Sequence, residues 1–155
     1  MAKKKKPTQR EFRAFIARSA SELLELLGLA HWKCSIRFLR HADSEDVEAL
    51  KTPLRVTVKS KYRVCVLDIY PFLKELYEAG GAPACRSYLL HEFVHIMLDE
   101  PFELLLSRSP AATHKHIDAL EERVVEHITR AILRAEGTWE PIELQHASHP
   151  PITRA

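Results

Sequence analysis

The chain has 155 residues and a formal net charge of +2, and 46% of its residues are hydrophobic and 28% are charged. This length is typical of one domain that can bury a core without disulfides or a structural metal. The composition excludes a disordered chain, and no apolar run is long enough to span a membrane. The first lysines are not followed by the apolar block of a signal peptide. We therefore expect a soluble cytoplasmic protein.

Positive charge is concentrated at the start of the chain. Residues 1–10 hold five of the 23 basic groups and no acid, which leaves 18 basic against 21 acidic groups elsewhere. We predict a basic disordered arm over 1–10 and a mildly acidic body. A body of that charge is not typical of a nucleic-acid-binding domain, so we expect nucleic-acid contact only through Lys3–Lys6.

The first predicted elements are a helix and a strand. Residues 8–27 have the helical period, and Gly28 stands where such a helix is expected to end. The next stretch, 31–39, alternates polar and apolar side chains, which predicts a strand with one buried face. The polar stretch 41–53 predicts a loop.

A hairpin and a short helix are expected next. The stretches 54–58 and 62–70 are alternating and rich in β-branched residues, and a polar link joins them. Pro71 then begins a short helix that ends at the glycine pair 80–81.

Two longer helices are predicted in the second half of the chain. Pro83 is placed to begin the first, which we expect to end near Asp99 because Pro101 follows. An irregular segment is expected over 101–113, and a second helix over 114–137.

These elements predict a single α+β domain over 11–137, with an extended C-terminal tail over 138–155. The small antiparallel sheet is expected to pack on the first long helix and on the glutamate-containing helix that follows it.

The first long helix contains the pattern H-E-x-x-H in residues 91–95. Because an α-helix advances about 100° per residue, His91 and His95 lie one turn apart on one face and can bind one ion. Glu92 lies close to that face, where a carboxylate can take the proton of a metal-bound water.

A catalytic zinc site needs three protein ligands and one open position. Glu122 and Glu126 are one turn apart beside the apolar stripe of the later helix. We predict Glu122 as the third ligand and Glu126 as the carboxylate that accepts the free ring N–H of His91.

Three other side chains are alternatives for the third ligand. Glu121 could replace Glu122 if the helix is rotated, and His114 or His116 could reach the metal from the start of that helix. Two imidazoles and a carboxylate suit Zn²⁺, which we predict, although iron, cobalt and nickel accept the same donors.

H-E-x-x-H followed on a later helix by E-x-x-x-E resembles the gluzincin metallopeptidases. The small size is similar to the minigluzincins and to related phage and prokaryotic proteins. The resemblance covers roughly residues 30–135 and implies a zincin-like fold. It also implies that the metal ligands are His91, His95 and Glu122, and that Glu92 is the general base. Glu126 stands where the family usually has aspartate.

The activity implied by the resemblance is hydrolysis of a peptide bond in a protein or peptide substrate, through a zinc-bound water with Glu92 as the base. In the family an extended substrate pairs with an exposed strand edge, which we expect 62–70 to present. The alternative is a catalytically silent zinc-binding module of phage or prokaryotic origin with a regulatory or interaction role. The presence of Glu92 favours the enzyme, because a structural zinc site has no use for a free carboxylate.

The cysteines give no further site. Cys34, Cys65 and Cys85 are far apart and odd in number, and no C-x-x-C is present. We expect small buried side chains in a reducing compartment and neither a disulfide framework nor a cysteine zinc site.

Overall fold

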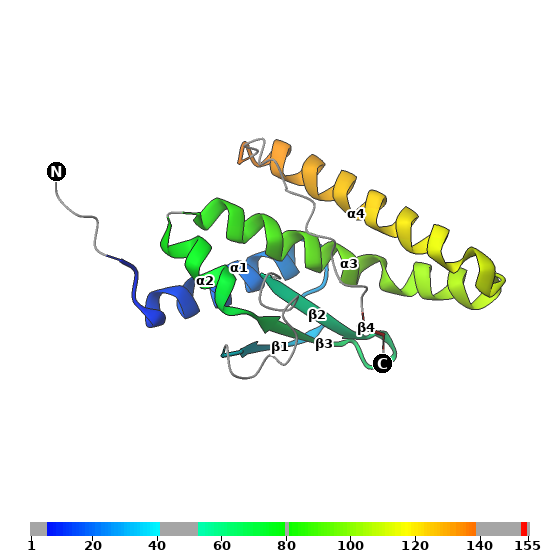
Figure 1. Ribbon diagram of the computed structural model, residues 1–155, viewed down its shortest axis with the longest axis horizontal. Coiled ribbons are helices and arrows are strands. Elements are labelled where there is room, and N and C mark those ends of the chain that lie inside the picture. Colours follow the sequence, from blue (N-terminus) through cyan, green and yellow to red (C-terminus); the bar gives the residue numbers. More distant parts are fainter. Residues whose placement is uncertain (1–5, 41–52, 80, 139–152, 155) are drawn as a thin grey trace.

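The computed structural model has an α+β fold (Figure 1). Its elements are α1 (Gln9–Leu26), β1 (Lys33–Phe38), β2 (Leu54–Lys59), the 3-10 turn η2 (Ser60–Tyr62), β3 (Val64–Ile69), α2 (Pro71–Glu78), α3 (Ala82–Arg108), the 3-10 turn η3 (Ala111–Thr113), α4 (His114–Ala135) and β4 (Thr153–Arg154). The residues that the structure describes are 6–40, 53–79, 81–138 and 153–154. Half of the predicted arm and most of the predicted loop and tail lie outside them. The prediction of a disordered arm up to residue 10 is wrong at its end, because Thr8 caps α1 and the helix begins at Gln9.

The sheet is mixed, and its strand order is β1-β3-β2-β4. The predicted hairpin is confirmed, because β2 and β3 run antiparallel with Val56 opposite Leu67. However, β1 runs parallel to β3, with Cys34 opposite Cys65, so the prediction of an antiparallel sheet is wrong for this pair. Alternation along a strand predicts its buried face but carries no information on the direction of its neighbour.

β3 lies in the middle of the sheet, between β1 and β2. The expectation that 62–70 presents an open edge is therefore wrong. The core-facing side chains of β3, which are Cys65, Leu67 and Ile69, are at most 1% exposed. Such complete burial suits a central strand. The outer edge of β2 pairs, among the described residues, with the two residues of β4.

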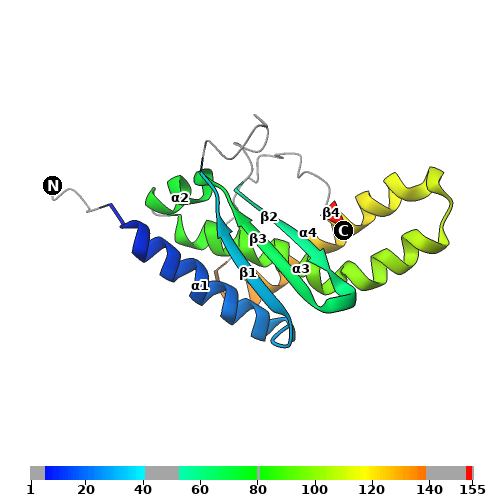
Figure 2. The same cartoon turned by 90° about the horizontal axis from the view of Figure 1, so that it is seen from below.

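Helices α1 and α3 cover one face of the sheet, and no described element covers the other face (Figure 2). The core between the layers is formed by apolar residues of α1, α3 and the strands, among them Phe12, Ile16, Leu67 and Phe93. Thr8 caps α1 through reciprocal hydrogen bonds with Glu11, which satisfies backbone donors that the first turn leaves free. Within the described ranges, no helix combines the length and apolar character that a membrane span requires.

Helix α3 continues through Pro101 to Arg108, so the predictions of a helix end near Asp99 and of an irregular segment after it are wrong over 101–108. A proline inside a helix removes one hydrogen bond and crowds the carbonyl four residues earlier, at a cost of about 3 kcal/mol. Beyond Pro101, α3 continues as one arm of a hairpin with α4 that extends beyond the sheet (Figure 1).

Helix α4 returns antiparallel to α3 after the turn η3, and the helix predicted over 114–137 is confirmed as far as Ala135. It packs on α3, which lies between it and the sheet, so the expectation that the sheet packs on this helix is wrong (Figure 1). Gly137 has φ +68, the left-handed conformation that commonly ends a helix. Arg86 of α3 joins the ends of three helices, because its guanidinium contacts Glu22 of α1 at 3.1 Å and Glu136 after α4 at 2.9 Å.

We predict that Pro101→Ala raises the free energy of unfolding by about 1–2 kcal/mol, because alanine restores the missing backbone donor inside α3. The measurement is urea unfolding followed by circular dichroism. Pro83→Ala is the matched control, since Pro83 lies in the first turn of the same helix, where no backbone donor is needed. Equal effects of the two substitutions would contradict a continuous α3.

Candidate metal centre

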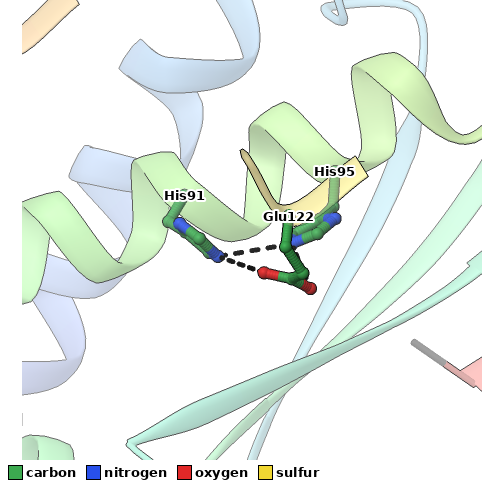
Figure 3. Close-up of side chains that lie close together, drawn as sticks. All are labelled: His91, His95 and Glu122. Atoms are coloured by element: carbon green, nitrogen blue, oxygen red, sulfur yellow. Dashed lines mark hydrogen bonds and ion pairs between the residues drawn. The ribbon is translucent and has the colours of Figure 1, made fainter. Parts of the chain in front are cut away.

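The H-E-x-x-H histidines lie on the side of α3 that faces α4. Both are buried, with His91 7% and His95 2% exposed. Glu122 of α4 points its carboxylate between them (Figure 3). Within the described part of the chain, this is the one group of three or more potential ligand side chains close enough to share an ion.

The spacing of the donor atoms fits a tetrahedral zinc ion. The two Nε2 atoms are 3.3 Å apart, and the Glu122 oxygens lie 3.4 Å from Nε2 of His95 and 3.7 Å from Nε2 of His91. Zinc bonds of about 2.0–2.1 Å arranged as a tetrahedron place neighbouring donors about 3.3–3.4 Å apart. The two imidazole nitrogens match this separation, and the Glu122 oxygens, a different one for each histidine, lie at it or slightly beyond it. The three side chains therefore have the chemistry, and nearly the separation, that one such ion requires.

The other ring nitrogens of the histidines face carboxylates. Nδ1 of His95 is 3.1 Å from Oε1 of Glu121, which is almost fully buried. An Nδ1–H that donates to Glu121 leaves the Nε2 lone pair of His95 free for a metal. Glu126 lies 3.8 Å from Nδ1 of His91, an ion-pair distance that is longer than the predicted hydrogen bond.

The sequence predicted Glu121 only as an alternative metal ligand. In the structure, the Glu121 carboxylate instead faces the ring nitrogen of His95 that points away from Glu122. The available signal was its position next to Glu122: two consecutive helix residues point about 100° apart, so they can approach one imidazole from two sides.

Glu92 is buried beside the cluster, between α3 and the sheet. Burial raises the pKa of its carboxyl, while the nearby His91 and His95 act in the opposite direction. The backbone N–H of Val56 in β2 donates a hydrogen bond to this carboxylate and favours its charged form. The general-base candidate thus lies between the histidines and the outer edge of β2.

The electrostatics of the cluster favour a cation. Burial lowers the pKa of His95, but hydrogen bonds to Glu121 and Glu122 outweigh it and raise that pKa to about 9. Burial raises the pKa of Glu122, yet hydrogen bonds from His91 and His95 hold it well below its usual range. Positive charge is therefore stabilised between these side chains, where carboxylates outnumber imidazoles.

The alternative histidine ligands lie elsewhere. His114 begins α4, two helical turns before Glu122, and its Nε2 lies 3.2 Å from the Ser109 carbonyl oxygen. His116 is exposed. Neither belongs to the group formed by His91, His95 and Glu122.

The face of α3 that holds the histidines continues toward the β2–β3 turn. Asp99, one turn beyond His95, is 2% exposed and accepts a hydrogen bond from the Ser60 hydroxyl. This bond joins α3 to the end of β2. A cavity of about 330 Å³ lies next to it, between residues 58–62 and Glu103.

No family model, curated protein or solved structure matches the chain. The resemblance to gluzincins accordingly depends on the motif residues themselves. The geometry of the centre supports a metal site on its own, because donors from two different helices converge on one point.

We predict that Glu121→Gln weakens zinc binding about 10- to 100-fold, because the amide holds the His95 ring less firmly than a carboxylate does. The measurement is competition with a chromophoric chelator. Glu100→Gln, an exposed position on α3, is the control and should bind zinc like the wild type. Unchanged affinity in Glu121→Gln would exclude a positioning role for Glu121.

Proposed function

We propose that the protein is a zinc-dependent metallopeptidase. The observation that carries this proposal is the convergence of the His91 and His95 Nε2 atoms and the Glu122 carboxylate, at distances of 3.3–3.7 Å, beside the buried carboxylate of Glu92. His91, His95 and Glu122 would hold the ion. Glu126 and Glu121 would orient the two imidazoles.

Zinc held there would supply Lewis acidity toward water and toward a substrate carbonyl. Glu92 accepts the proton of the attacking water and then returns it to the leaving amine. Its raised pKa suits both steps, since a base that must release its proton again works best with a pKa near the working pH. The Val56 N–H holds the carboxylate in place between the steps.

The substrate proposed is an extended peptide. The outer edge of β2 runs beside Glu92, and backbone groups along such an edge can pair with an added strand. β4 already pairs with Thr57 and Val58 on this edge, so a longer peptide would have to displace it. The cavity beside Asp99 lies at the end of the same edge and could take a substrate side chain.

An enzyme is favoured over a silent zinc-binding module. A structural zinc site is normally closed by four protein ligands, whereas the group found among the described residues has three. The Glu122 side chain is 40% exposed, in contrast to 2% for His95, so the cluster is open on the Glu122 side. A silent module would also have no need of a carboxylate in the position of Glu92.

We predict that the purified protein binds about one zinc per chain and that Glu122→Ala loses most of it, because two imidazoles alone bind zinc weakly. Metal content is measured by mass spectrometry after dialysis against zinc. His114→Ala and His116→Ala are controls and should keep the metal. If Glu122→Ala retained zinc while His114→Ala lost it, the third ligand would be His114.

We further predict that Glu92→Gln keeps the zinc and lowers kcat for peptide hydrolysis at least 100-fold, since glutamine cannot accept the proton. A quenched fluorescent peptide library provides the assay, and Glu100→Gln is the control with wild-type activity expected. Activity that is absent from the zinc-loaded wild type as well would favour the silent module.

A further inference from the structure

Two of the three cysteines are direct neighbours in the sheet, although 30 residues separate them in the chain. Cys34 of β1 lies opposite Cys65 of β3, in register on adjacent parallel strands. Both belong to the core face, since Cys65 is fully buried and Cys34 is half-buried against the core cluster. The two thiols therefore point from the same side of the sheet.

The backbone geometry permits a bond between them. Adjacent strands lie about 4.8 Å apart, and disulfides join residues whose Cα atoms are about 4.4–6.8 Å apart. The register therefore brings the two Cα atoms within the range that a disulfide requires. The third cysteine is different: Cys85 is buried on α3, with its thiol directed at the Leu73 carbonyl oxygen at 3.5 Å.

The two thiols have unequal acidity. A hydrogen bond from Cys65 lowers the pKa of Cys34 and raises that of Cys65, whose burial raises it further. Cys34 is also the more accessible of the two. Thiolate character and access together determine which cysteine an oxidant attacks first, and both favour Cys34.

We propose that Cys34 and Cys65 are an oxidation site at which hydrogen peroxide produces a reversible disulfide between β1 and β3. Cys34 attacks peroxide, its O–O bond breaks, and a sulfenic acid and one water are formed. The Cys65 sulfur then attacks the Cys34 sulfur, which releases the sulfenic oxygen as a second water with the Cys65 proton. A small dithiol reverses the reaction by thiol–disulfide exchange.

The bond would join the sheet's outermost strand to its central one. Among the described strands, β1 pairs with β3 alone, so its attachment depends on that ladder of hydrogen bonds and on its core-facing side chains. A covalent link between residues 34 and 65 restricts the unfolded chain and should raise the thermal midpoint by several degrees. It does not touch the metal centre, which lies between α3 and α4.

The test uses the full chain, purified in reductant and exposed briefly to hydrogen peroxide. Remaining thiols are alkylated, and a non-reducing digest is analysed by mass spectrometry. We expect one linked peptide pair that joins Cys34 to Cys65, an alkylated Cys85, and a thermal midpoint several degrees higher that returns to its original value with dithiothreitol.

Cys85→Ser is the matched control and should form the same Cys34–Cys65 disulfide. Cys34→Ser should form no disulfide, so any change in its thermal midpoint after peroxide treatment measures the effect of methionine oxidation. The proposal is overturned if the folded wild type keeps three free thiols. It is also overturned if Cys85 takes part in the link, or if Cys34 proceeds to sulfinic acid without one. Wild-type protein alone decides between these outcomes, so a variant that fails to fold would not obscure the result.

Discussion

The structure depends on the burial of helix α3 on two sides. One side packs Leu89, Phe93 and Ile96 into the core with the sheet, and the other side faces α4. Because both sides are covered, the polar residues of the second side cannot be solvated by bulk water and must find partners within the protein. Each of the two histidines has a carboxylate at Nδ1, and their Nε2 atoms face each other and Glu122.

This arrangement couples the metal centre to the helical hairpin. Two donors come from α3 and the third from α4, so an ion bound to all three would join the helices and stabilise the folded state through its binding energy. Pro101 weakens α3 beyond the centre, yet the helix continues to Arg108 as one arm of the hairpin with α4. The helix pairing that tolerates the proline is also what brings Glu122 to the histidines.

The central position of β3 has two consequences, one at its edge toward β2 and one at its edge toward β1. It leaves β2 with an outer edge beside the metal centre, where the Val56 N–H can bind Glu92. It also places β1 parallel to β3 in the register that sets Cys34 against Cys65. The candidate catalytic edge and the thiol pair thus both follow from one feature of the topology.

The sequence by itself determined the elements and the motif. Hydrophobic period and glycine positions predicted α1, the hairpin and α4, because these signals act within a few residues of the chain. H-E-x-x-H placed His91 and His95 on one helix face by local geometry alone. The sequence predicted Glu122 and left His114 as an alternative, and the tertiary structure decided that Glu122 meets the histidines. The tertiary structure alone decided that Glu121 faces His95 and that α3 passes through Pro101. It also decided that β3 is central and that Cys34 lies beside Cys65. Each of these depends on how separate elements pack against one another, which local patterns do not encode.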